Sequence, residues 1–204
     1  MDRLDQLLDA ATPLLRRAGD LLEEAGAPAE DPLWDQLRRV RLLPADAVTA
    51  VAALRPAALA EAVPELRSAA RSCAGVAAAL PPPGEWEGEA AETYDDLRRR
   101  VATHLAGDGD SLDERLEATA DLADALHDWM SRSRDAVAAV LAEVLMSAEA
   151  LTLQTSPVAH PPEPADLQAA VTVATHVLRT IADLYAEAED LIHNSTHLTT
   201  PIPV

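Results

Sequence analysis

Hydrophobic residues recur along most of the chain at spacings of three and four residues, which is the period of a helix with one apolar face. β-branched residues never form alternating runs, so the pattern predicts no strand. The predicted helices share this period and cover about residues 2–24, 32–40, 46–79, 85–106, 111–152 and 165–193. We therefore predict an all-α fold: an elongated antiparallel bundle with a coiled-coil-like hairpin and flanking N- and C-terminal helices.

Two of these helices alternate spacings of four and three along a single seam. In the helix over 111–152 the seam contains Leu112, Leu116, Thr119, Ala123, Leu126, Met130, Ser133, Val137, Val140 and Val144. In the last helix it contains Leu167, Val171, Ala174, Leu178, Ile181, Tyr185, Ala188 and Ile192. This is the spacing of coiled coils, so we expect these helices to pack lengthwise.

Prolines, glycines and capping residues divide the pattern. Pro56 and Pro64 are expected to kink the helix over 46–79, and the run Pro81-Pro82-Pro83-Gly84 ends it. After a predicted hinge at 107–110, Ser111 and Glu114 have the spacing of a capping box. The predicted organisation is N-terminal helices at 1–44, a helical hairpin at 45–155, a Pro-rich linker at 156–164 and a C-terminal helix with its tail at 165–204.

Composition and charge narrow the function classes. Apolar residues form 49% of the 204 residues, which is enough to build a core. Sixteen arginines stand against 35 acidic residues, giving a net charge of −19 that repels phosphate backbones. Nucleic acid is therefore not expected as a partner. The arginines at 98–100, 132 and 134 are expected on solvated helix faces with intrahelical ion pairs.

The amino terminus lacks the features of a Sec signal. Its first ten residues contain acidic residues at positions where such a signal needs basic residues followed by an apolar run. The most apolar stretch, 46–63, holds Asp46, Arg55, Pro56 and Glu61, so we expect no integral membrane segment. The chain is expected to be synthesised in the cytoplasm.

No catalytic residue or cofactor is predicted. The chain has no Gly-x-Ser-x-Gly, no P-loop and no dinucleotide-binding glycine motif. Its one cysteine, Cys73, has helical spacing from Ala70 and Ala77 and is expected to be buried as a small apolar residue.

Metal sites are also not predicted. Asp124-x-x-His127 and Asp190-x-x-His193 fit half of a carboxylate-bridged site in a bundle, but sequence places no further carboxylates beside them. His193 and His197 form one pair at a helix end, where the side chains are expected to be solvated.

Asp108, Asp110 and Asp113 suggest a calcium loop at first sight. Such a loop needs an oxygen ligand at its fifth position and Glu at its twelfth, and those positions hold Leu112 and Thr119. A hinge is the favoured interpretation of this segment.

One motif carries more specific information. Trp86-Glu87-Gly88 follows a Pro-Gly turn between two apolar-periodic helices, and Tyr94 follows at helical spacing with Ala90, Ala91 and Leu97. This arrangement resembles the WXG-motif family of type VII secretion substrates, which are helical hairpins with Trp-x-Gly at the turn.

A second element of that family, read with its partners, is an export signal of the form Tyr-x-x-x-Asp/Glu near a helix end. Tyr185 and Glu189 match it in the last predicted helix. Tyr185 also lies on the seam, so an aromatic residue at the edge of the core remains the alternative. The chain departs from the simple family pattern in its double length, in the break at 107–110 and in carrying both elements.

The resemblance implies a non-enzymatic substrate or carrier module of a type VII (ESX-like) secretion system. Its implied partners are another helical hairpin protein, a secreted toxin or a second copy, together with the secretion ATPase, and its implied destination is the medium or the cell envelope. The implied recognition residues are Trp86, Gly88, Tyr94, Tyr185 and Glu189. Two alternatives stay open: a cytosolic interaction scaffold or chaperone that is not secreted, and a metal-binding helical enzyme.

Overall fold

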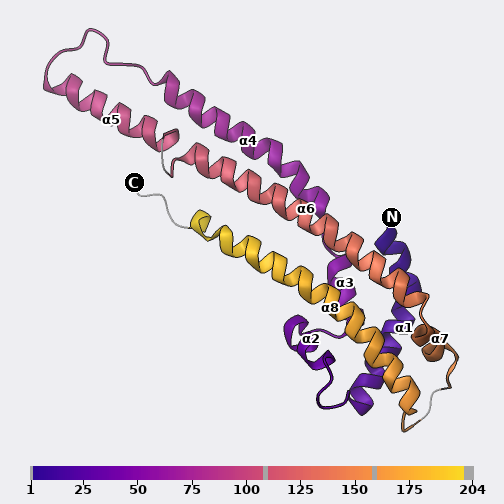
Figure 1. The fold of residues 1–204 in the computed structure, drawn as a ribbon. Coiled ribbons are helices and arrows are strands. Elements are labelled where there is room, and N and C mark those ends of the chain that lie inside the picture. Colours follow the sequence, from indigo (N-terminus) through magenta and orange to yellow (C-terminus); the bar gives the residue numbers. More distant parts are fainter. Residues whose placement is uncertain (1, 108–109, 158–159, 200–204) are drawn as a thin grey trace. The chain divides into compact units, whose positions relative to one another are not determined.

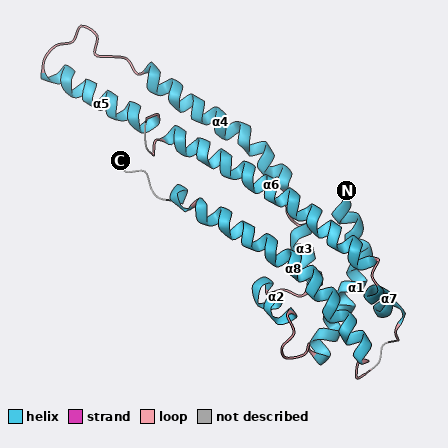
Figure 2. Ribbon diagram, viewed as in Figure 1, coloured by secondary structure: helices cyan, strands magenta, loops and turns pink. Residues whose placement is uncertain are grey.

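The computed structural model describes residues 2–107, 110–157 and 160–199, and it contains helices and loops but no strand among them (Figures 1 and 2). The all-α prediction is confirmed. The helices are α1 (Arg3–Ala25), α2 (Leu33–Val40), α3 (Pro44–Ala52), α4 (Pro56–Ala79), α5 (Glu89–Leu105), α6 (Leu112–Leu145), α7 (Ala148–Thr155), α8 (Pro164–Asn194) and a 3₁₀ turn, η1 (Thr196–Thr199). The predicted hinge, linker and tail fall partly on 108–109, 158–159 and 200–204, which lie outside the described residues.

The chain divides into two compact units. The first unit is Met1–Arg55 with Trp129–Asp190, and the second is Pro56–Asp128 with Leu191–Val204. The division falls inside α6, between Asp128 and Trp129, so this helix contributes to both units. The domain limits predicted from the sequence describe other stretches of the chain and stay predictions.

The first unit contains an extensive hydrophobic core. Its largest fully buried side chains come from six helices and include Leu4, Leu15, Leu33, Val48, Leu141, Leu153, Leu178 and Ile181. The later part of the α6 seam and most of the α8 seam point into this core, where Val137 and Val140 of α6 lie with Val171 and Leu178 of α8. Ile192, the last predicted seam residue, is instead 62% exposed.

A buried arginine ties three segments of the first unit together. Arg134 of α6 is only 9% exposed, and its guanidinium donates to the carboxylates of Asp2 and Asp5 and to the carbonyls of Ala52 and Leu54. The Asp5 amide and the Arg134 guanidinium hold the pKa of Asp2 below its usual value. The expectation that Arg134 lies on a solvated face is therefore wrong, because its partners come from α1 and the end of α3.

The second unit has a much smaller core. Val63 of α4 and Ala120 and Ala123 of α6 form its buried cluster, with Leu66 partly buried against them. These contacts place α4 beside the first part of α6 (Figure 1). α4 also packs against α5.

Polar contacts reinforce the packing of α4 on α6. Arg67 of α4 lies 3.7 Å from Glu117, 3.1 Å from Asp121 and 2.8 Å from Asp124 of α6. Because three acidic residues surround one arginine, this cluster keeps a net negative charge.

Two helices predicted as continuous are interrupted. The helix over 46–79 is in fact α3 and α4, because Pro56 has no amide to donate and disfavours helical geometry at Arg55. Pro64 lies inside α4.

The predicted helix over 111–152 consists of α6 and α7, which meet at an angle of 64°. The Ser147 hydroxyl accepts a hydrogen bond from the Ala150 amide and caps the start of α7.

The capping box predicted at Ser111 is also wrong. The Ser111 hydroxyl donates to Gly107 and Asp113, and the Asp113 carboxylate accepts from the Glu114 amide. The Glu114 carboxylate accepts from the Asp110 amide instead of the Ser111 amide. A carboxylate that accepts more strongly than a hydroxyl thus takes over the cap.

A capping box does occur at α1, which the sequence analysis did not identify. The Asp2 carboxylate accepts from the Asp5 amide, and the Asp5 carboxylate accepts from the Asp2 amide. Cys73, expected to be buried, is half-buried.

Candidate partner-binding site

The turn between α4 and α5 presents Trp86 to solvent. Trp86 is 65% exposed, whereas Trp34 is 36% and Trp129 only 8% exposed. The indole N–H of Trp129 donates to the carbonyl of Leu184, as that of Trp34 does to the carbonyl of Pro28. Trp86 is thus the tryptophan that contributes least to the packing of its own chain.

Glycines with positive φ shape this turn. Gly84 has φ +68° and Gly88 has φ +89°, a region that side chains with Cβ rarely adopt. A Cβ added at Gly88 would meet no atom within 4 Å, so the backbone conformation, and not lack of space, requires glycine. Gly88 stands at the N-cap of α5, so Trp86 lies two residues before the cap and three before Glu89, where the helix begins.

Tyr94 joins the turn to α5. Its hydroxyl donates to the carbonyl of Pro81 at 2.9 Å, across the whole turn. Its ring meets that of Trp86 edge to face, with centroids 5.9 Å apart and planes at 79°. Tyr94, predicted as a recognition residue, therefore holds Trp86 and the proline run in place.

A groove of about 520 Å³ runs from Trp86 along one side of α5. Its lining residues are Pro83, Trp86, Glu87, Gly88, Ala91, Glu92, Asp95, Asp96 and Arg99. The sequence from 81 to 97 contains six acidic residues and no basic one. The groove therefore combines an exposed aromatic ring with strong negative charge.

Arginines neutralise only the far end of this groove. Arg98 and Arg99 pair with Asp95, and Arg99 also lies 3.1 Å from Asp96. The hydrogen bond from Arg98 is the main reason that the pKa of Asp95 lies below its usual value. These intrahelical pairs were predicted for the 98–100 run.

The second predicted recognition element lies in the first unit. Tyr185 of α8 is half-buried and packs against the core of that unit, as the seam predicts. Glu189, one turn further, is exposed. Trp86 and Tyr185 thus belong to different compact units.

The residues considered for metal binding make other contacts. The Asp124 carboxylate accepts from Arg67, and His127 Nδ1 lies 2.9 Å from the carbonyl of Pro56. Asp110 pairs with Arg115, 2.6 Å away. Within 2–107, 110–157 and 160–199, no group of three or more His, Cys, Asp or Glu side chains is arranged to hold a metal ion. The predicted partner of His193, His197, has no described side chain.

Sequence reasoning missed Arg17, a structural residue of the first unit. Its guanidinium donates to the Ser156 carbonyl at 3.0 Å and lies 3.8 Å from the buried Asp166 carboxylate. Asp166 stands in the first turn of α8, where a negative charge is favourable. The acidic first turn after a proline run was the available signal, although the sequence could not show which arginine faces it.

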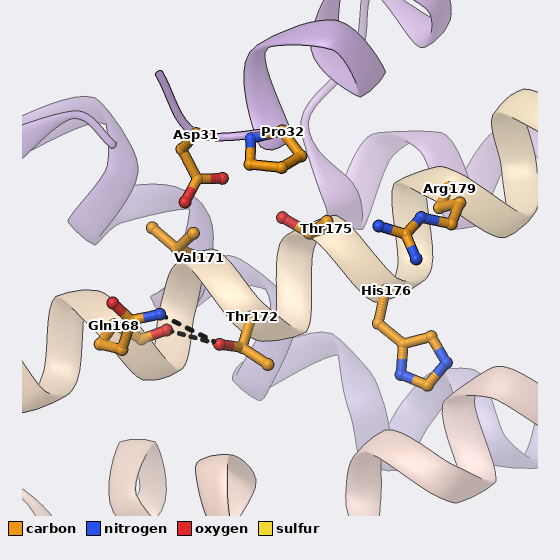
Figure 3. Close-up of a pocket in the computed structure, with 8 residues that line it drawn as sticks. All are labelled: Asp31, Pro32, Gln168, Val171, Thr172, Thr175, His176 and Arg179. Carbon is orange, nitrogen blue, oxygen red and sulfur yellow. Dashed lines mark hydrogen bonds between the residues drawn. The ribbon is translucent and has the colours of Figure 1, made fainter. Parts of the chain in front are cut away.

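A second hollow, of about 420 Å³, lies between α8 and the start of α2 (Figure 3). On α8 the Thr172 hydroxyl donates a hydrogen bond to the Gln168 carbonyl. The Asp31 carboxylate accepts a hydrogen bond from the Leu33 amide. His176 lies 3.5 Å from Glu143. Asp31 thus bonds to the first turn of α2, and His176 to a neighbouring helix, so both side chains make contacts within the fold.

Two regions pass a test for membrane-spanning helices by length and composition alone. One is the stretch Pro44–Ala79, and the other is the bent pair α6 and α7 taken together. Core helices of soluble proteins pass the same test, so the absence of a membrane segment stays a prediction.

Comparison with known proteins adds no relative. No family model, no curated protein and no solved structure matches the chain.

Proposed function

We propose that this chain is a non-enzymatic substrate or carrier module of a type VII secretion system, which binds a partner protein through the turn around Trp86. The observation that carries the proposal is the 65% exposure of Trp86 on a turn that Gly88 and the Tyr94–Pro81 hydrogen bond hold in place. Tryptophan in a pre-organised position is a frequent anchor of protein interfaces, because its burial releases much apolar surface at little entropic cost.

The resemblance to WXG-motif proteins connects this anchor to export. In that reading the Trp86-x-Gly88 turn and the Tyr185-x-x-x-Glu189 element together form the signal that the secretion ATPase recognises. Glu189 is exposed and therefore accessible to a receptor, while Tyr185 is half-buried at the core edge. The cargo or partner would be another helical protein, a secreted toxin or a second copy of the chain.

Fractionation of the native host tests this proposal. Tagged wild type, Trp86→Ala, Gly88→Ala and Glu189→Gln would be followed in cells, envelope and medium beside a cytosolic marker and a known type VII substrate. We expect the wild type outside the cytosol and all three variants retained. Trp34→Ala and Glu187→Gln are matched controls, because neither changes a defining residue of the two motifs, and we expect both to be exported.

Each variant needs a check of its folding by circular dichroism and urea denaturation. Tyr185→Phe keeps the ring that packs on the core, so it tests the hydroxyl alone. If all proteins remain cytosolic while the known substrate is exported, the secretion proposal is wrong. A cytosolic scaffold or chaperone would then be the better description.

A further inference from the structure

We propose that the groove beside Trp86 binds an arginine- or lysine-bearing segment of a partner protein. The cation would lie against the indole of Trp86 and between the carboxylates of Glu87 and Glu92. This inference rests on the proposed function only in taking the Trp86 turn as the docking surface, and it adds the chemistry of the partner.

The groove has the dimensions of a binding site for a short peptide segment. Its residues on α5, from Ala91 to Arg99, recur at spacings of three and four and so lie on one side of the helix. Together with the turn they extend over about three helical turns, or about 16 Å. Ala91 is 6% exposed and forms the floor, whereas Trp86 stands at one end.

The charge along the groove is uneven. Asp95 and Asp96, at the far end, already pair with Arg98 and Arg99. Glu87 and Glu92 are exposed and, in the part of the chain that the structure describes, have no ion pair. The uncompensated negative charge therefore lies at the end where Trp86 is.

An aromatic face beside two free carboxylates favours a cation. Arginine or lysine over an indole is attracted by the negative ring face, and carboxylates hold the same group by charge-assisted hydrogen bonds. Arginine suits such a site well, because its planar guanidinium can stack on the ring and bond to a carboxylate at once.

Other occupants conflict with the charge. A second copy placed turn to turn would bring the same six acidic residues together, and each copy has a net charge of −19. Nucleic acids and anionic lipid surfaces would be repelled for the same reason. A basic segment of another protein is the occupant that the charge complements.

The probe for the test is a synthetic alanine-rich helical peptide with two arginines four residues apart. Its control is the same peptide with citrulline, which is neutral, in place of arginine. The three tryptophan indole N–H signals are followed by NMR in the full chain, and the Trp86 signal is assigned with Trp86→Phe. We expect the arginine peptide to shift the Trp86 signal, with weaker binding as salt rises.

A double variant that carries both Glu87→Gln and Glu92→Gln should lose affinity for the peptide by about fivefold or more. The control carries Glu61→Gln and Glu65→Gln, exposed acids of α4 outside the groove, and should bind as the wild type does. Equal binding of the citrulline peptide, equal losses in the two double variants, or an unmoved Trp86 signal would overturn the inference. Self-association that the groove variant abolishes would overturn it in favour of a second copy.

The outcome is separable from that of the secretion test. If Trp86→Ala blocks export but the arginine peptide does not bind, this inference fails and the proposed function stands. If the peptide binds as described and no protein leaves the cytosol, the secretion proposal fails while the basic partner stands.

Discussion

The two units of the chain use the same helix-forming residues with very different results. In the first, α1, α3, α7, α8 and the second part of α6 bury a large set of leucines and valines, and Leu178 and Ile181 are completely inaccessible. In the second, the buried cluster is Val63, Ala120 and Ala123. The large exposed apolar side chains of α4, α5 and the turn between them are Val76, Trp86, Leu97 and Val101.

This difference indicates that the two units have different roles, one in stability and one in binding. Burial of apolar surface is the main favourable term in folding, so most of the stability should come from the first unit. Alanine is a strong helix former but buries little area, which lets the alanine-rich α4 stay helical without a deep core. The second unit is therefore free to offer its turn and groove to a partner.

The largest expected effect is a core truncation in the first unit. Leu178→Ala should lower the free energy of unfolding by about 2–5 kcal/mol, because it leaves a cavity where the side chain is fully buried. Leu97→Ala, in the second unit, should change it by no more than about 0.5 kcal/mol, since Leu97 is 53% exposed. Urea denaturation followed by circular dichroism measures both, and similar losses would contradict the comparison.

Loss of the buried arginine should come next. Arg134→Ala leaves the Ala52 and Leu54 carbonyls without their donor and is expected to cost about 1–3 kcal/mol. Arg134→Lys should restore only part of this, because an ammonium cannot reproduce the guanidinium fork. Arg132→Ala is the matched control, since Arg132 is exposed and its partner Glu187 lies 3.5 Å away. An equal loss for Arg132→Ala in urea denaturation would show that burial does not matter here.

A smaller effect should appear as the pH falls. The folded-state pKa of Asp2 lies below its usual value of 3.8, so the ionised carboxylate stabilises the fold. That contribution is fully present above about pH 4 and is lost as the pH falls through the lower folded-state pKa. Asp2→Asn should therefore flatten the decline of the unfolding free energy below pH 4, measured by urea titrations at several pH values. An unchanged slope would contradict the assignment.

The smallest expected effect comes from replacing Arg67, the arginine that joins α4 to α6 in the second unit. Arg67→Gln removes the cation between Glu117, Asp121 and Asp124, and should speed amide exchange in α4 and the first part of α6. The change should be smaller than for Arg134→Ala and should fade at about 1 M salt, which screens exposed charges. A loss as large as that of Arg134→Ala, insensitive to salt, would make Arg67 a buried structural residue.

Hydrophobic period was sufficient to predict helical structure and the seams of α6 and α8 in the first unit, but it did not separate α3 from α4 or α6 from α7. It was not sufficient for residues whose partners lie far along the chain. Arg134 and Asp2 are separated by 132 residues, and their pairing depends on how α1 packs on α6. A spacing rule for exposed intrahelical pairs could not anticipate it.

The candidate site shows the same limit. The Trp-x-Gly motif located the turn, and positive φ at Gly88 agrees with its glycine. The hydrogen bond from Tyr94 to Pro81 depends on how far the proline run folds back, which local propensities do not set. The break at Pro56 could have been predicted, since proline favours the first turn of a helix over its interior.

Native-state hydrogen exchange of the whole chain, read by mass spectrometry, most directly tests whether packing is concentrated in the first unit. The described contacts predict slow exchange in α8 from Val171 to Ala182 and in α6 from Val137 to Val144, at rates set by global unfolding. They predict much faster exchange in α5 and the turn around Trp86, where side chains are largely exposed. Protection of α5 equal to that of α8 in the isolated chain would contradict the account.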